Sequence, residues 1–153
     1  MRKTSSKAYR DDIVARCRIY VPAGDGEVSF IDTRDIAAVA GQCLREASHL
    51  GEHLTLTGPE RLTFAEAARQ LSDGLGRPIR YQPASALGYW CHLRKQGAST
   101  IQALVQTILH TGLRKGEGAA LTDTVARVLG RPPGRLVDYF RDHQDCWRAR
   151  EGE

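Results

Sequence analysis

The 153-residue sequence lacks several features that would assign it to a specialised class of protein. It contains no apolar run near the ~20 residues that cross a bilayer, and its start, MRKTSSKAYRDD, has no apolar signal core. Its four cysteines form no CxxC pair and follow no regular histidine spacing, which argues against a metal site or a disulfide scaffold. Hydrophobic residues at 41% and charged residues at 26% are near the globular average. We therefore expect a cytoplasmic globular protein that holds no metal and does not insert into a membrane.

Acidic residues are missing from a long internal stretch. Residues 74–116 carry six Lys or Arg and no carboxylate, whereas residues 21–73 carry nine acids and four Arg. Two interpretations stay open: the basic stretch contacts an anionic ligand or acidic partner, or it neutralises the acidic stretch within one fold. No zinc-finger or RNP-type motif accompanies the basic residues, so we do not expect nucleic-acid binding.

The first half of the chain has an α/β pattern. A helix over residues 8–17 leads into Arg18–Val21, and a Pro/Gly turn occupies 22–26. Short β-type runs follow at 28–31, 53–57 and 79–82. Between these runs we expect one helix that Asp32 caps and one that starts with a capping box, Thr63 with Glu66.

The second half is expected to be helical. Ser85 caps one helix, and Ser99 with Gln102 forms a second capping box. The helix behind Ser99 carries a strong apolar stripe, typical of a face that is buried, formed by Ile101, Leu104, Val105, Ile108, Leu109 and Leu113. Two shorter helices follow, one after Thr122-Asp123 and one over residues 136–143.

This order predicts an α/β part followed by an all-α part. Strands that alternate with helices favour parallel pairing through right-handed crossovers. Three short strands form only a small sheet with two open edges, however, and parallel sheets usually have more strands. Part of a larger sheet is missing from this pattern.

Three separated motifs carry a family resemblance. Residues 26–40 are GEVSFIDTRDIAAVA, residues 54–79 are LTLTGPERLTFAEAARQLSDGLGRPI, and residues 130–143 are GRPPGRLVDYFRDH. Together they resemble the C-terminal half of an NmrA-like protein, an atypical short-chain dehydrogenase/reductase. The resemblance implies the C-terminal part of a Rossmann-like fold, with about three short parallel-type strands and helices, followed by an all-α substrate lobe. It divides the chain into a basic leader with a short helix (1–18), a Rossmann-like portion (19–83) and a helical substrate lobe (84–153).

The family binds NADP or NAD, but the residues for this are not in the sequence. Its dinucleotide fingerprint is a Gly-rich turn between a strand and a helix, where backbone N–H groups hold the pyrophosphate. The sequence has no GxxGxxG and no GxGxxG, and no Tyr has a Lys four residues on. We therefore expect no cofactor to be held by this chain alone and assign no catalytic residue.

Tyr20, Pro22 and Trp90 are the candidate substrate-pocket residues. Tyr20 and Pro22 precede the IDTRDIA segment in a loop that resembles the family's pocket wall, and ordinary turn chemistry is the alternative. Trp90 is on a helix of the substrate lobe and could line a pocket, with core packing as the alternative.

Asp32, Arg34 and Asp35 form a second group where a run of β type meets a helix, the side on which α/β folds bind ligands. A helix cap and a local ion pair explain the same residues. Glu66 is expected to act only as a cap.

Two functions of different classes follow. In the first, the chain is a truncated or split NAD(P)-dependent oxidoreductase, its substrate-lobe half, inactive alone and acting on an unknown small molecule with a separate N-terminal Rossmann half. In the second, it is a non-catalytic interaction or regulatory module that uses an exposed sheet edge and its basic stretch to bind a partner or to form a homodimer.

Overall fold

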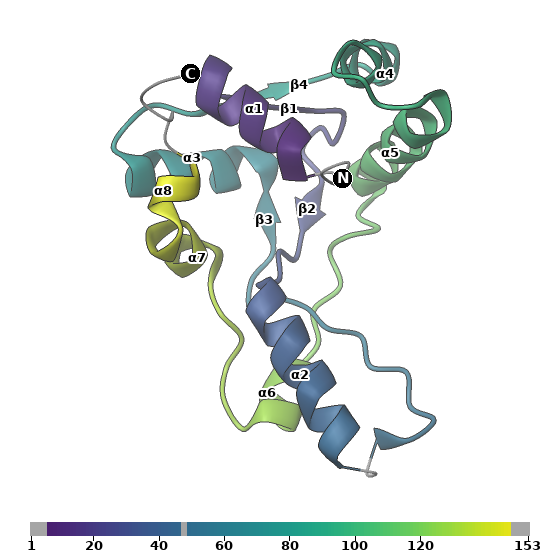
Figure 1. The fold of residues 1–153 in the computed structure, drawn as a ribbon, viewed down its shortest axis with the longest axis vertical. Helices are drawn as coiled ribbons and strands as arrows, with labels where there is room; N and C mark the ends of the chain where they lie inside the picture. The colour runs from purple at the N-terminus through teal and green to yellow at the C-terminus, as the bar shows by residue number, and fades with distance from the viewer. Residues whose placement is uncertain (1–5, 47–48, 148–153) are drawn as a thin grey trace.

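Two strands far apart in the sequence form the centre of the structure. The computed structural model describes residues 6–46 and 49–147. Helix α1 (Ser6–Arg16) leads into β1 (Arg18–Val21), which pairs in parallel with β4 (Arg80–Pro83) (Figure 1). Parallel neighbours need a crossover connection, and here the crossover is residues 22–79. The expected α/β organisation of the first half is thereby confirmed.

Arg77, which lies shortly before β4, forms hydrogen bonds with the C-terminal end of α1. Its guanidinium donates hydrogen bonds to the carbonyl oxygens of Ile13 (3.1 Å), Val14 (3.3 Å) and Trp147 (3.0 Å). The last carbonyls of a helix have no partner within the helix, and a basic side chain can satisfy them. One side chain from the crossover therefore ties α1 to the C-terminal end of the described chain.

A second two-stranded sheet is antiparallel. Strand β2 (Glu27–Val28) pairs with β3 (Leu62–Thr63). Gly26, just before β2, lies so close to the carbonyl of Leu113 that a Cβ at this position would clash with it. Only glycine allows this approach of two backbones. The turn at 22–26 thus brings β2 against the helical second half.

Helix α3 (Phe64–Leu75) starts and ends as its sequence predicts. Thr63 Oγ1 accepts a hydrogen bond from the amide of Glu66, and the Glu66 carboxylate accepts one from the amide of Thr63. Gly76 ends the helix in the left-handed conformation (φ 63°). The expected capping box is confirmed.

The second half is helical, as expected. Ser85 caps α4 (Ala86–Lys95) and Ser99 caps α5 (Thr100–Gly112), and each side chain accepts a hydrogen bond from the amide three residues on. The two helices pack on each other beside the body of the molecule. A 3₁₀ turn, η2 (Leu113–Lys115), follows α5.

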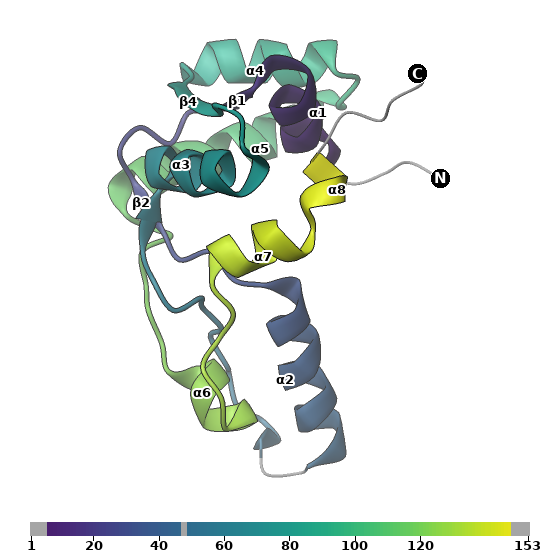
Figure 2. The ribbon, with the colours of Figure 1, turned by 90° about the vertical axis from the view of Figure 1, so that its left-hand side faces the viewer.

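Two helices project from the body as an arm. These are α2 (Thr33–Arg45) and α6 (Thr124–Leu129), which pack on each other at the bottom of Figure 1. The chain then returns to the body through α7 (Leu136–Asp142), which packs on α3, and α8 (Gln144–Trp147) (Figure 2). No described helix is long and apolar enough to cross a membrane.

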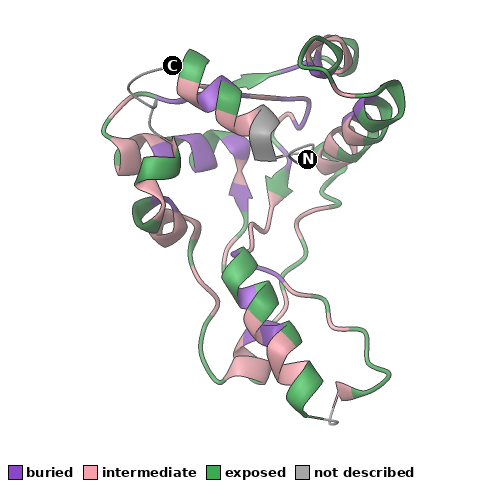
Figure 3. Ribbon diagram, in the orientation of Figure 1, coloured by how far each residue is buried: buried purple, intermediate pink, exposed green. Residues whose placement is uncertain are grey.

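The hydrophobic core lies in the body. Figure 3 shows the buried segments gathered around α1, β1 and α3. Leu71, Val21 and Leu93 are almost wholly enclosed, and Phe140 of α7 joins the same cluster. The arm has a much smaller buried set, which includes Val39 and Val125.

The prediction of a strand at residues 53–57 is wrong, because these residues pair with no other strand in the described chain. The structure shows no regular strand there, and the run expected at 28–31 is a strand only at β2. A strand needs a neighbouring backbone to complete its hydrogen-bond ladder. Within the described residues no strand lies beside 53–57, and the side chain of Thr122 binds it instead, donating to the Thr55 carbonyl (2.7 Å).

The expectation that the α5 stripe is buried is also wrong. Ile101 is 76% exposed, and Ile108 and Leu109 are each 62% exposed. The helix instead packs through its smaller face, in which Ala103 and Thr107 are buried. The periodicity correctly predicted an amphipathic helix, but the described chain contains nothing that covers its apolar side.

Candidate functional site

A small cavity lies where α1, β1 and α4 meet. Its hollow of about 10 Å³ has room for roughly one water molecule. The residues around it are polar, aromatic or both, with one exception: Tyr9, Asp12, Tyr20, Tyr89, His92 and Leu93. Such a concentration of titratable and aromatic groups in one cavity makes it the candidate functional site.

Asp12 is the buried charge of this cavity. Its side chain is only 5% exposed, and its Oδ2 lies 2.6 Å from Nε2 of His92 on α4. Oδ1 faces two guanidinium groups, Arg16 at 3.4 Å and Arg18 at 3.6 Å. A carboxylate removed from water needs such partners. The pair with His92 therefore joins α1 to the helical lobe.

Tyrosine hydroxyls form the other wall of the cavity. Burial raises the pKa of Tyr89 to about 12, and burial raises the pKa of Tyr9 further still. Both phenols are protonated at neutral pH, as any tyrosine is, and burial makes their ionisation still less favourable, so each hydroxyl can donate a hydrogen bond. Tyr9 Oη is hydrogen-bonded to Nε2 of His110 on α5, whose pKa burial lowers below the ordinary histidine value.

Aromatic rings hold these groups in place. The ring of Tyr20 meets the imidazole of His92 edge-on, with centroids 5.1 Å apart, and lies 6.5 Å from the ring of Tyr89. The guanidinium of Arg18 lies over the ring of Tyr20, 4.6 Å from its centroid. The aromatic and basic groups therefore form one contiguous layer from β1 to α4.

The structure brings one of the three predicted pocket residues into this cavity. Tyr20 lines it, on β1. Pro22 is almost fully buried in the turn that follows β1. Trp90 is partly buried, packs against the core cluster and does not line the cavity, whereas its neighbours Tyr89 and His92 do.

The acidic group at the start of α2 has structural partners. Asp32 caps the helix, accepting from the Arg34 amide at 2.8 Å, and its carboxylate pairs with the Arg34 guanidinium at 2.7 Å. This pairing lowers the pKa of Asp32 below its ordinary value. Asp35 is 2% exposed and accepts hydrogen bonds from Arg131 and from the Gly134 amide, both at 2.7 Å. The group joins the arm to the segment before α7.

Sequence reasoning missed Asp12 and assigned no role to His92. The two residues are 80 positions apart, and nothing in the local sequence of either one indicates the other. The only local signal was the position of Asp12 in α1, directly before the apolar Ile13, which is buried. A buried acid of this kind requires a basic partner from another element.

The starts of α2, α3 and α4 do not form the glycine-rich turn that holds a dinucleotide pyrophosphate. A pyrophosphate cradle needs a glycine-rich turn between a strand and the N-terminus of a helix. In the described chain, α2, α3 and α4 begin directly after Asp32, Thr63 and Ser85. Each of these side chains already accepts a hydrogen bond from an amide in the first turn of its helix, and none of the segments before them contains the required glycines. Nor do the described residues contain a group of three or more His, Cys, Asp or Glu side chains that could hold a metal ion.

The chain is similar in sequence to curated reductases, although no protein-family model matches it. It is 34% identical to the NAD(P)H azoreductase of Xenophilus azovorans, over 92% of this chain and 49% of that protein. It is 31% identical to an uncharacterized oxidoreductase of Bacillus subtilis, again over 92% of this chain and 49% of the relative. The chain therefore spans about half the length of the curated relatives it matches.

A solved structure shows the same fold. The NADPH-dependent quinone oxidoreductase of Escherichia coli, in complex with NADPH, superimposes with a TM-score of 0.81 and 23% identity, covering 92% of this chain and 50% of that one. The chain matches the C-terminal half of these NAD(P)-binding, NmrA-like reductases, as the three motifs indicated. The expected fold class, the C-terminal part of a Rossmann-like fold, is confirmed.

Proposed function

We propose that this chain, a relative of the C-terminal half of NmrA-like reductases, is the substrate-lobe half of an NAD(P)H-dependent oxidoreductase and is inactive alone. One observation carries the proposal: 92% of the chain matches an NAD(P)H azoreductase, yet the match spans only 49% of that enzyme. The nucleotide-binding turn of such an enzyme has no counterpart in the sequence. Catalysis therefore requires a Rossmann-type nucleotide-binding half.

On this proposal the chain contributes the substrate side of the active site. Tyr20 and Tyr89 line the cavity, and burial raises the pKa of Tyr89 further above the ordinary value, at which a tyrosine is already protonated at neutral pH. The cavity has room for about one water molecule, so on this proposal its phenols support the wall of the substrate pocket through hydrogen bonds within the cavity and do not contact the acceptor. The Asp12–His92 pair fixes α4 against α1 and so holds both phenols in position.

A non-catalytic interaction or regulatory module is the second candidate. The exposed apolar side of α5 favours it, because a large apolar patch on a surface marks a contact site. The two candidates differ in one respect: the first requires reductase activity once a nucleotide-binding half is present, and the second does not.

Turnover by a single-chain fusion tests the proposal. The N-terminal half of the Xenophilus azovorans azoreductase is joined to this chain, and NADPH oxidation is followed with an azo dye or a quinone as acceptor. We expect the fusion to oxidise NADPH and this chain alone to be inert. Tyr89→Phe should lower kcat/KM by about tenfold, the loss of one hydrogen bond of about 1.4 kcal/mol. Tyr139→Phe, on α7 and outside the cavity lining, is the matched control.

Two results would contradict the proposal. Oxidation of NADPH by this chain alone would show that it holds the cofactor itself. A fusion that folds and binds NADPH but reduces neither acceptor would favour the interaction module.

A further inference from the structure

Two histidines of the helical second half contact one face of α1. Tyr9 and Asp12 are three residues apart on α1 and therefore share a face. Asp12 pairs with His92 of α4, and Tyr9 Oη is hydrogen-bonded to Nε2 of His110 on α5. Because α4 and α5 pack on each other, these two contacts together hold α1 against the pair of helices.

The backbone of α5 fixes the tautomer of His110. Its Nδ1 lies 2.6 Å from the carbonyl oxygen of Gln106, which can only accept a hydrogen bond. Nδ1 therefore carries the proton of the neutral ring, and Nε2 accepts the hydrogen bond that Tyr9 Oη donates. We call this contact between Tyr9 and neutral His110 the latch.

His92 and His110 differ in what a protonated ring would face. Nε2 of His92 lies 2.6 Å from the buried Asp12 carboxylate, an anion that matches the charge of an imidazolium. His110 faces two phenols instead, Tyr9 through the hydrogen bond and Tyr89 with its ring centroid 5.2 Å away. Burial lowers the pKa of His110 below the ordinary histidine value. A proton on His110 would place a charge among buried phenols rather than beside a carboxylate.

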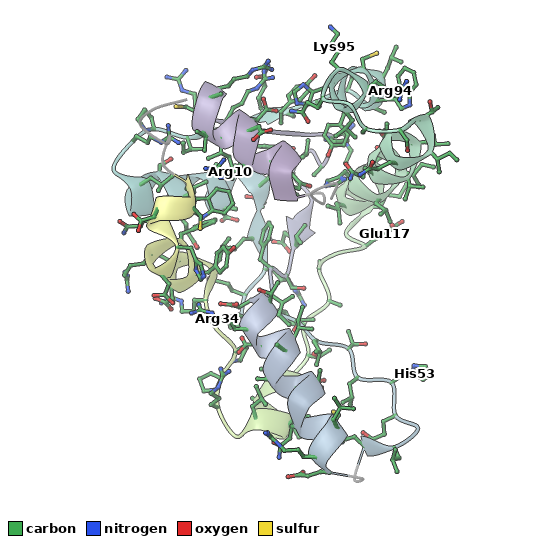
Figure 4. The ribbon with its side chains drawn as sticks, viewed as in Figure 1. Arg10, Arg34, His53, Arg94, Lys95 and Glu117 are labelled. Atoms are coloured by element: carbon green, nitrogen blue, oxygen red, sulfur yellow. The ribbon has the colours of Figure 1, made fainter. Side chains whose placement is uncertain are left out.

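The charged groups of α1 have partners of their own or are exposed. The Asp12 carboxylate faces Arg16 at 3.4 Å and Arg18 at 3.6 Å besides His92. Arg10 points to the C-terminal side of the molecule (Figure 4), where it donates to the Cys146 carbonyl at 2.6 Å. Asp11 is exposed to water. The buried carboxylate of α1 is therefore already balanced by positive charge.

The charged groups around α5 are mostly basic and all exposed. The basic ones stand before and after the helix: Arg94, Lys95, Arg114 and Lys115. The acidic Glu117 lies against Gly112 at the C-terminal end of α5 (Figure 4). Positive charge before and after α5 disfavours a further proton on His110.

We propose that the latch is a pH-sensitive switch: neutral His110 holds α1 against the α4–α5 pair, and protonation of His110 at mildly acidic pH releases α1 from α5. Above the pKa of an unfolded histidine, near 6.5, the ring is neutral in every state and the latch contributes fully. As pH falls below that value, the released state binds the proton more readily, and the closed state loses stability. Release opens the cavity at its α1 side and exposes Tyr89 and His92. The switch does not depend on the proposed function.

Hydrogen exchange of α1 as a function of pH tests the switch. Exchange of the α1 amides is measured by mass spectrometry between pH 7.5 and pH 5, relative to the intrinsic rate at each pH, in the parent and in His110→Gln. Glutamine retains an oxygen that can accept from Tyr9 but does not titrate. The open population should rise by up to about 30-fold more in the parent, if His110 is neutral when closed and protonates near 6.5 when released. His92 is present in both proteins, so its effect cancels in the comparison.

An exposed histidine provides the matched control. His53 lies on the arm, far from α1 (Figure 4), and His53→Gln should retain the pH dependence of the parent. Exchange of α3, which packs in the body, is the internal reference and should be the same in all three proteins. Circular dichroism at pH 7.5 verifies that each variant is folded.

The latch can also be followed in the unmodified protein. In a proton NMR titration, we expect the ring signals of His110 to shift at a lower pH than those of His53, and the signals of Tyr9 to change over the same range as those of His110. Tyr9→Phe removes the donor of the latch and should raise α1 exchange about fivefold at pH 7.5. The titration decides the question by itself if His110→Gln does not fold.

Three outcomes would overturn the proposal. Exchange of α1 that rises equally in the parent and in His110→Gln would show that another group senses the pH. An equal rise in α3 would show that acid unfolds the body as a whole instead of releasing α1. Titration of His110 together with His53 would show that the latch does not keep the ring neutral.

Discussion

At the scale of the residue, Asp12 connects the parts of the candidate site. Its carboxylate is almost fully buried between α1 and α4 and faces His92, Arg16 and Arg18. The tyrosines of the cavity carry no charge at neutral pH, and burial raises the pKa of Tyr9 and of Tyr89 further above the ordinary tyrosine value. Geometry in this site therefore depends on a few pairs of side chains from different elements.

Replacing Asp12 should weaken the whole molecule. Asp12→Asn leaves His92 and two guanidinium groups without their anion, and we expect the free energy of unfolding to fall by about 1–3 kcal/mol. Urea denaturation measures the change. The adjacent Asp11, which is exposed, provides the control: Asp11→Asn should shift the free energy by less than about 0.5 kcal/mol. Equal effects of the two variants would contradict the role given to the buried pair.

Asp32 should make stability depend on pH in the acidic range. Hydrogen bonding to Arg34 lowers its pKa in the folded state, so the folded protein binds a proton less readily than the unfolded chain. The resulting stabilisation is full above the unfolded value, near 3.9, and is lost as pH falls through the folded value. The difference in unfolding free energy between the parent and Asp32→Asn should therefore shrink as pH is lowered from 6 towards 2. A difference that stays constant over this range would exclude the ion pair as its source.

At the scale of the element, the sequence predicted structure correctly where the hydrogen-bonding atoms lie close together in the sequence. The caps at Asp32, Thr63, Ser85 and Ser99 were all predicted, since each depends on atoms within three residues of one another. A helix start is thus encoded in a short stretch of sequence.

The capping box gives the clearest test at this scale. Thr63→Ala removes the oxygen that accepts from the Glu66 amide, and we expect α3 to lose about 1 kcal/mol of stability. Thr63→Ser keeps that oxygen and should retain most of it. Thermal unfolding followed by circular dichroism distinguishes the two, and identical midpoints for Ala and Ser would show that the cap contributes little.

Elements that depend on distant partners could not be predicted in the same way. Residues 53–57 have a strand sequence, but a strand is a property of two backbones, and its neighbour is not among the described residues. The β2–β3 pair has only two residues on each side: the run at 28–31 predicted part of β2, whereas no β-type run was predicted at β3. The stripe of α5 predicted the correct helix and the wrong environment, because periodicity shows which face is apolar and not what covers it.

The candidate site follows the same rule. Tyr20 was singled out from its place in the sequence, and it lines the cavity. Asp12 and His92, 80 positions apart, meet only because β1 and β4 pair and bring α1 and α4 together. Such a juxtaposition is set by tertiary topology, which no local pattern encodes.

At the scale of the whole molecule, the chain has a well-packed body and an incomplete surface. The body has its own core, but the sheets are two-stranded, one strand-like segment is unpaired and the apolar side of α5 is in water. The relatives it matches are about twice as long and include an NAD(P)H azoreductase. These features together support an account in which the chain supplies the substrate lobe and a second half supplies the nucleotide site.

Calorimetric titration with NADPH tests this account most directly. The account predicts no saturable heat when NADPH is added to this chain alone, because its residues form no pyrophosphate cradle, and saturable one-site binding when the nucleotide-binding half of the azoreductase is present. Saturable binding of NADPH to this chain by itself would contradict it.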